Sequence, residues 1–149
     1  PREGNNWSYK YARRQWDLVD NKNLTYHYLA DFDEEMIKLI KSVKGIENTD
    51  VIEIWHNDGD QILAYQRKDL VFVFNFNPVK SFTDYGFLVS PGTYEVVLNT
   101  DAVKFGGNGL SDDTVKHSTI SDPFYEKEKK EWLKLYIPAR TAMVLKKTK

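Results

Sequence analysis

The sequence predicts a mainly β fold with helices at its amino-terminal end, in which about seven or eight strands form an antiparallel sandwich. Two observations predict this class. The spacing of apolar residues changes from a helical to a strand period close to Gly45. After that point, short alternating runs are separated by Gly, Pro, Asn and Asp turn signals. With 149 residues, the chain is long enough to bury a hydrophobic core without disulfide bonds.

Two helices are predicted before Gly45. Ser8 is a suitable N-cap for a short helix over residues 9–16. A second helical stretch begins near residues 21–23 and is stopped by Gly45. Two aspartates at residues 31–33 leave open whether this stretch is one helix or two. Its apolar positions recur every three or four residues and form one stripe: Leu24, Tyr28, Phe32, Met36, Ile40 and Val43.

Seven strands are predicted after Gly45, each bounded by turn residues. Residues 57–60, Asn-Asp-Gly-Asp, are a strong hairpin signal between the first two strands. The run at residues 70–76 is mostly apolar, so we expect it to be central and buried on both faces. A loop rich in Gly, Asp and Asn is expected from about residue 100 to 121. The predicted strands cover residues 51–56, 61–66, 70–76, 80–89, 93–99, 131–137 and 140–146.

The composition argues against several classes of partner. The formal net charge is -1, whereas nucleic acids and anionic membranes attract densely basic surfaces, so we expect no nucleic-acid partner. We also expect no membrane segment, because no apolar run approaches the roughly 20 residues that span a bilayer. The chain has no cysteine, which excludes disulfides and thiolate metal sites and agrees with a cytoplasmic location.

No group of residues has the pattern of a catalytic or metal centre, and we expect no cofactor. The acidic pairs at residues 58/60 and 112/113 lie in turn-rich sequence, where aspartate is favoured for turn geometry. A pair that cleaves glycosides would instead face across a sugar-sized gap. No histidine has a partner at the spacing of a metal motif; the three are His27, His56 and His117. No serine lies in a nucleophile elbow.

Aromatic residues remain as candidates for sugar contact, because indole and phenol faces stack on sugar rings. The candidates are Trp7, Tyr9, Tyr11, Trp16, Trp55, Tyr85, Phe105 and Trp132. Trp55 and Trp132 lie in predicted strands, and we expect at least one of them to pack in the core. Trp7 is the best placed for a ligand, because polar residues surround it in a loop. The predicted substrate-binding residues are Arg2, Asn5, Asn6 and Trp7.

Several stretches, in order along nearly the whole chain, resemble one family of enzymes. They are PREGNNWSYKYARRQW at residues 1–16, FVFNFNP at 72–78, SFTDY at 81–85, FGG at 105–107 and YIPARTA at 136–142. The family they resemble is that of the 1,4-α-glucan (glycogen/starch) branching enzymes. The resemblance implies a β module and an α-amylase-type (β/α)8 barrel, followed by an antiparallel carboxyl-terminal β-domain.

The chemistry implied by this resemblance lies outside the chain. Enzymes of this family cut an α-1,4 linkage through a covalent glycosyl-enzyme and transfer the chain to a 6-hydroxyl, which makes an α-1,6 branch. Their catalytic acids belong to barrel motifs that this chain does not contain, so no residue of this chain is predicted to be catalytic. Residues 1–45 would be the helical end of the barrel, with Trp7 near its catalytic rim. Residues 46–149 would be the α-amylase-type C-terminal β-domain.

The chain is therefore predicted to be a non-catalytic carboxyl-terminal portion of a branching enzyme, inactive alone, which supports the barrel. Contact with glucan is left open. Its partners would be a glycogen-like α-glucan and the catalytic barrel of the same polypeptide. A stand-alone carbohydrate-binding module is the alternative, and a small independent hydrolase is a third. Because the chain begins with Pro1 instead of Met, we expect an excised segment. Part of the helical stripe or of the 9–16 helix should then be exposed or covered by another copy.

Overall fold

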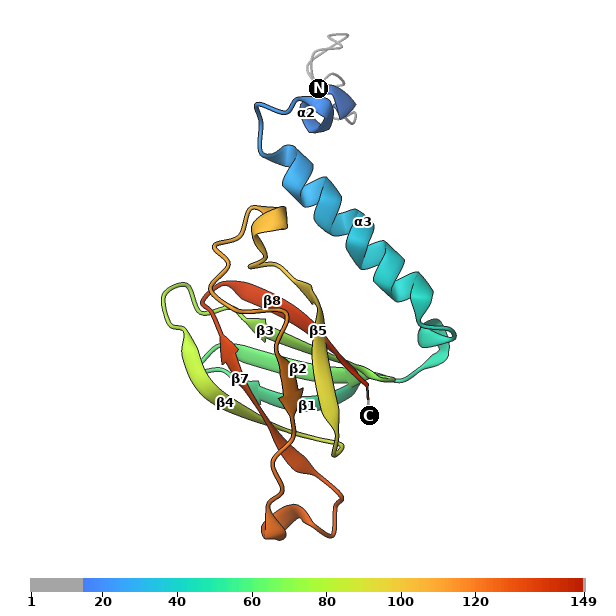
Figure 1. Ribbon diagram of the computed structural model, residues 1–149, viewed down its shortest axis with the longest axis vertical. Helices are drawn as coiled ribbons and strands as arrows, with labels where there is room; N and C mark the ends of the chain where they lie inside the picture. Colours follow the sequence, from blue (N-terminus) through green and yellow to red (C-terminus); the bar gives the residue numbers. More distant parts are fainter. Residues whose placement is uncertain (1–14, 149) are drawn as a thin grey trace, which may run out of the picture.

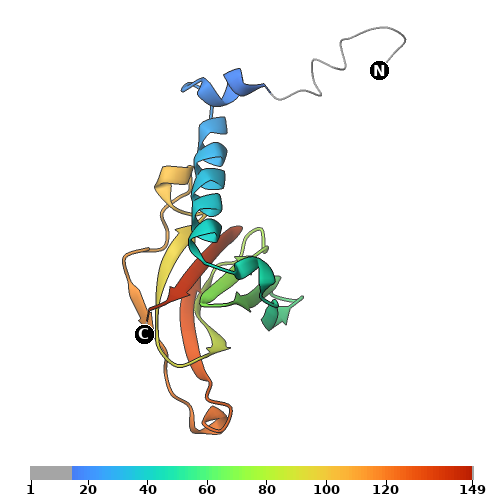
Figure 2. The ribbon, with the colours of Figure 1, turned by 90° about the vertical axis from the view of Figure 1, so that its right-hand side faces the viewer.

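The computed structural model describes residues 15–148, in which α3 (Tyr26–Ser42) packs against one side of a β-domain and α2 (Trp16–Asp20) lies at the far end of α3, away from the sheets (Figure 1). α2 is short, whereas α3 is a long rod whose beginning projects beyond the sheets (Figure 2). Gly45 adopts a φ of 73° after α3, a left-handed conformation that turns the chain into the 3₁₀ turn η1 (Ile46–Asn48). No helix in this part of the chain is long and apolar enough to cross a membrane.

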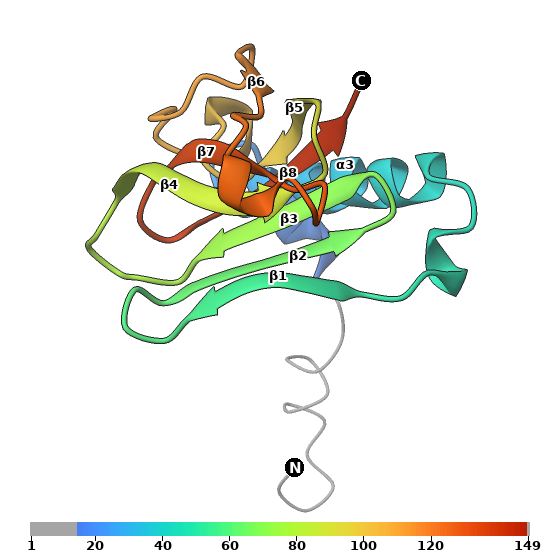
Figure 3. The same cartoon turned by 90° about the horizontal axis from the view of Figure 1, so that it is seen from below.

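The β-domain is an antiparallel sandwich, as predicted. Its strands are β1 (Ile52–Asn57), β2 (Ile62–Arg67), β3 (Leu70–Asn75), β4 (Phe82–Val89), β5 (Thr93–Asn99), β6 (Lys116–Ser118), β7 (Glu131–Ile137) and β8 (Thr141–Lys147). Six strands pair in the order β1-β2-β3-β8-β5-β6, and β4 pairs with β7 in a second sheet. β1, β2 and β3 lie side by side along one edge (Figure 3). β3 is central, as its apolar sequence predicts.

The main core lies between the two sheets. Alternation along β7 turns Leu133, Leu135 and Ile137 inward, and each is at most 2% exposed. Val71 and Val73 of β3 meet them from the larger sheet. Each fully buried side chain of this kind contributes roughly 1.5–3 kcal/mol relative to an exposed one. The β-domain therefore has a closed core of its own.

Asn75 connects the two sheets through hydrogen bonds. Its side chain is 2% exposed at the end of β3. Its Nδ2 donates to the carbonyl oxygens of Lys80, Ile137 and Pro138, at 2.9, 3.2 and 2.9 Å. Its Oδ1 accepts the backbone N–H of Asn77 at 2.9 Å. One buried amide thus fixes the loop before β4 and the turn after β7.

A smaller core joins α3, from Phe32 onward, to the β-domain. Phe32 and Ile40 of α3 pack against buried Leu98 of β5 and its neighbours. Phe32 also meets Phe105 edge to face, with ring centroids 5.2 Å apart. This contact lies beside η2 (Val103–Phe105), which Figure 1 shows next to α3. The α3 helix is therefore attached along one side only.

Within its secondary structure, the β-domain differs from the sequence predictions in one segment, and α3 resolves an alternative that the sequence left open. β6 pairs with β5 inside the segment predicted to be only a loop, so that prediction was wrong there. A strand of three residues is too short to show an alternating pattern. α3 runs unbroken through residues 31–33, because aspartate is tolerated on an exposed helix face. The helix predicted over residues 9–16 lies outside the described residues, apart from its last two positions.

Candidate functional site

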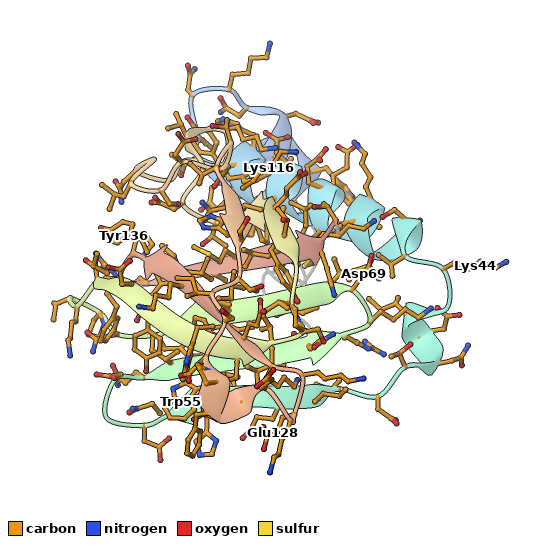
Figure 4. All side chains as sticks on the ribbon, turned by 60° about the horizontal axis from the view of Figure 1, so that its bottom comes forward. Lys44, Trp55, Asp69, Lys116, Glu128 and Tyr136 are labelled. Carbon is orange, nitrogen blue, oxygen red and sulfur yellow. The ribbon has the colours of Figure 1, made fainter. Side chains whose placement is uncertain are left out.

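A hollow of about 860 Å³ lies between β1, β4, β7 and the segment 120–125. Five aromatic residues line it, of which Phe87 is buried in the main core, and we call it the aromatic hollow after the other four: Trp55, Tyr85, Tyr125 and Trp132. Figure 4 shows Trp55 on the side of the β-domain away from α3. A volume of this size matches the clefts that hold small ligands.

Trp132 is fixed on the outer face of β7 by three contacts. Its Nε1 donates to Asp122 Oδ2 at 3.0 Å, and its ring meets Tyr125 edge to face at 5.6 Å. It also covers Gly86 of β4, where an added Cβ would lie 2.9 Å from Trp132 Cε3. Glycine at this position therefore lets the indole lie flat against the neighbouring strand.

Trp55 is held from the opposite side by a chain of hydrogen bonds. Its Nε1 donates to Tyr85 Oη at 3.1 Å, and Tyr85 Oη donates to Asp60 Oδ2 at 3.2 Å. Asp60 also pairs with Lys80, at 3.1 Å. Partial burial raises the pKa of Tyr85, so its hydroxyl stays protonated and keeps the donor role at neutral pH.

Asp122 has a structural role and is not suited to proton transfer. Its Oδ1 accepts the N–H of Phe124 at 3.0 Å and so caps η3 (Pro123–Tyr125). The hydrogen bond from Trp132, together with the one from Phe124, lowers the pKa of Asp122. A general acid for glycoside cleavage needs the opposite shift. Asp122 therefore holds the turn and the indole of Trp132 in place, and its lowered pKa does not suit a general acid.

The other candidates for chemistry have local partners. Asp113 accepts a hydrogen bond from Asn99 at 2.7 Å, and Asp112 accepts two from Thr114 within its own turn. His56 contacts Glu53 at 2.7 Å on the exposed face of β1. Within residues 15–148, no group of three or more His, Cys, Asp and Glu side chains could hold a metal ion.

A second surface, on the helices, is apolar and exposed. It consists of Trp16, Tyr26, Leu29 and Ile37, which are 62, 52, 65 and 48% exposed, and we call it the α2–α3 apolar face. A shallow groove of about 250 Å³ lies between its two helices. Met36, of the predicted stripe, is also 39% exposed. The prediction that part of the helical apolar surface is exposed is confirmed.

The structure brings together three of the aromatic candidates and leaves others untested. Trp55, Tyr85 and Trp132 meet in one hollow, although they come from three strands. The expectation that Trp55 or Trp132 packs in the core was wrong, because Trp55 is 46% exposed on an edge strand and Trp132 lies on the outer face of β7. The predicted substrate-binding residues lie outside the described residues: Arg2, Asn5, Asn6 and Trp7.

The sequence analysis did not identify Tyr125 or the charged residues of the hollow: Asp84, Asp122 and Lys134. Asp122 and Tyr125 lie in a segment that carries no alternating pattern. The signal that could have found them is the Asp-Pro pair at residues 122–123, which is typical of a capped turn, followed at once by two aromatic residues.

Comparison with known proteins points to one family. Residues 53–148 match the family model "Alpha amylase, C-terminal all-beta domain". A 1,4-alpha-glucan-branching enzyme from Felis catus is 41% identical over 97% of this chain and 21% of its own length. A 1,4-alpha-glucan-branching enzyme from Candida glabrata is 39% identical over 97% of this chain and 20% of its own length. A chloroplastic/amyloplastic one from Oryza sativa subsp. japonica is 43% identical over 80% of this chain and 15% of its own length. The chain thus spans about a fifth, or less, of the length of these relatives.

Proposed function

Because its β-domain matches that family model over residues 53–148, the chain belongs to the α-amylase C-terminal all-β domain family, and we propose that it is the non-catalytic carboxyl-terminal portion of a 1,4-α-glucan-branching enzyme. In this proposal residues 1–45 form the end of the catalytic barrel domain and residues 46–149 form the terminal β-domain. The chain contributes support to the catalytic barrel and has no catalytic residue of its own. We place it in the cytoplasm, which its lack of cysteine favours.

The observation that carries the proposal is the α2–α3 apolar face. The β-domain closes its own core, yet the helices keep Leu29 and Ile37 65 and 48% exposed. A cluster of large apolar side chains on a surface marks an interface. The relatives continue well beyond the matched segment, since the chain covers only 21% of the Felis catus enzyme. We assign the catalytic barrel of the same polypeptide as the partner that covers this face.

A stand-alone carbohydrate-binding module is the second candidate, and the aromatic hollow favours it. Such a module would need no barrel, and its α2–α3 apolar face would have no purpose. The proposed portion of a branching enzyme accounts for both surfaces, with the helices facing the barrel and the hollow facing outward. We propose contact with α-glucan as a separate role, on which the support of the barrel does not depend.

An exchange of the terminal segment tests the proposal. The matching fifth of the Felis catus relative is replaced by this chain, and Leu29→Glu is introduced both in this chimera and in the chain alone. In the chain alone Leu29 is 65% exposed, so the variant should melt within a degree or so of the wild type. In the chimera the same change buries a charge at an interface and should cost about 2–4 kcal/mol.

Glu34→Ala is the matched control, because Glu34 is on the same helix and its side chain is 64% exposed beside Lys38. It should have little effect in either protein. Equal effects of Leu29→Glu in the chimera and in the chain alone would contradict the assigned interface. Branching of glucan by the chain alone would contradict the non-catalytic role.

A further inference from the structure

The aromatic hollow has no role in the support of a barrel, because it lies away from the helices. The segment that closes it, residues 120–125, belongs to the loop that extends from the end of the β-domain opposite α3 (Figure 1). Trp55 lies on that side as well (Figure 4). A partner that covers the α2–α3 apolar face would therefore leave the hollow open to solvent.

The rings of the hollow are held in place before any ligand arrives. The Nε1 atoms of Trp55 and Trp132 already donate, at 3.1 and 3.0 Å, to Tyr85 and Asp122. Their N–H groups are thus satisfied within the protein, and what they present to the hollow is ring surface. Rigid rings lose little conformational entropy when a ligand binds. This arrangement suits a ligand that stacks on aromatic faces.

The polar groups of the hollow suit a neutral ligand with many hydroxyl groups. The charged side chains that line it are Asp84, Asp122 and Lys134. Two acids and one base do not form the basic surface that a phosphate or nucleic acid requires. Carboxylates accept hydrogen bonds from hydroxyl groups and an ammonium donates to them. Thr83 and Ser121 add hydroxyl groups of their own.

We propose that the aromatic hollow binds glucose residues of an α-glucan, whose ring faces stack on Trp55 and Trp132 and whose hydroxyl groups bond to Asp84, Asp122 and Lys134. The choice of α-glucan rests on the proposed function, since the relatives are named for 1,4-alpha-glucan. Bound there, a glucan chain would be held on the outer face of the terminal domain and kept close to the catalytic barrel. The site acts in binding and takes no part in bond cleavage.

The test is a titration of the intact chain with maltoheptaose, followed by nuclear magnetic resonance. The chain has four tryptophans, so its indole N–H groups give four separate signals. We expect the signals of Trp55 and Trp132 to shift and saturate, and that of Trp16 to stay. Addition of maltoheptaose up to about 20 mM allows dissociation constants in the millimolar range to be measured. No shift at Trp55 and Trp132, or a shift at Trp7 alone, would overturn the proposal.

Two variants and a control complete the test. Trp55→Ala and Trp132→Ala should each raise the dissociation constant about tenfold or more, because each removes a stacking surface. Phe124→Ala is the matched control, since Phe124 is 79% exposed beside the hollow but does not line it. Unchanged affinity in Trp55→Ala, with its native spectrum retained, would refute the site. The wild-type shifts need no variant, so a misfolded variant cannot hide the result.

The outcomes separate this site from the proposed function. If Leu29→Glu destabilises the chimera but the chain does not bind maltoheptaose, only the proposed sugar site is contradicted. If the chain binds maltoheptaose but Leu29→Glu has no effect in the chimera, the proposed barrel interface is contradicted and a carbohydrate-binding module is supported.

Discussion

The buried amide of Asn75 joins the two sheets, and its replacement should destabilise the sandwich. Its Nδ2 faces three carbonyl oxygens within 3.2 Å, and its Oδ1 accepts one N–H. An amide has only two hydrogens to donate, so these contacts amount to about two donated bonds and one accepted bond. At about 1 kcal/mol each, Asn75→Ala should lose about 3 kcal/mol of unfolding free energy.

Asn75→Asp should lower the free energy of unfolding more than Asn75→Ala does at neutral pH, because it replaces a donor with an acceptor that faces the same three carbonyl oxygens. Burial and these carbonyl oxygens disfavour the charged form, so the pKa of the new carboxyl should rise above its unfolded value of about 3.9. A raised acid pKa means that the folded state holds the proton more tightly. The variant should therefore be least destabilised near pH 4 and lose stability as pH rises through the folded pKa.

Urea unfolding at pH 4.5 and pH 7 measures both variants. With a slope of about 2 kcal/mol/M, Asn75→Ala should move the midpoint down by about 1.5 M at either pH. Asn48→Ala is the control, because Asn48 is exposed and its side chain donates only to the neighbouring Glu47. A midpoint for Asn75→Ala close to that of Asn48→Ala, or an Asn75→Asp variant without pH dependence, would refute this account of how the sheets are joined.

Four further outcomes are expected. Gly107→Ala should cost about 2 kcal/mol or more in urea unfolding, because its Cβ would lie 2.2 Å from the backbone of Asp101, whereas Gly59→Ala, with 3.4 Å of space, should cost about 1 kcal/mol or less. Burial raises the pKa of Tyr94 to about 12, so alkaline absorbance titration should show one tyrosine that ionises only with unfolding or above pH 11. Burial lowers the pKa of His117 in the folded state below its unfolded value of about 6.5. The neutral imidazole therefore contributes stability that is fully present above about pH 6.5 and is lost as pH falls through the pKa of the folded state. His117→Gln should flatten that acid branch in melting curves. Finally, the chain alone should leave the iodine complex of amylose unchanged, and new α-1,6 linkages would contradict this.

The strands could be predicted from the sequence because each one carries its own signal. In β7, inward Leu133, Leu135 and Ile137 alternate with outward residues, and the pattern survives in the structure. The hairpin between β1 and β2 follows from its Asn-Asp-Gly-Asp turn. The order of the strands was not in these local patterns, because pairing of β3 with β8 joins residues far apart in the chain.

The aromatic hollow could be predicted only in part for the same reason. Trp55 and Tyr85 were both candidates, but their contact joins positions 30 residues apart and depends on how β1 meets β4. The outward place of Trp132 did follow from its alternation with Leu133, and that signal should have outweighed its size and apolar character. A large aromatic residue in a strand is a guide to burial only when its own face of the strand is apolar.

The attachment of α3 also shows a limit of pattern analysis. Phe32 and Ile40 of the predicted stripe both lie in the smaller core, packed on the β-domain. Leu29 and Ile37 border that stripe, three residues before Phe32 and Ile40, yet both stay exposed, so the apolar surface of α3 is wider than the part that packs on the β-domain. A period identifies the apolar side of a helix and does not show how much of its width is covered.

Hydrogen exchange along α3 tests most directly whether the chain serves as the support of a barrel. The amides of residues 26–37 are compared between the chain alone and the chimera with the Felis catus relative, with β3 and β8 as internal references. We expect strong protection of α3 in the chimera, weak protection in the chain alone, and equal protection of the reference strands in both. Equal exchange of α3 in the two proteins would show that nothing covers its apolar face and would contradict the account.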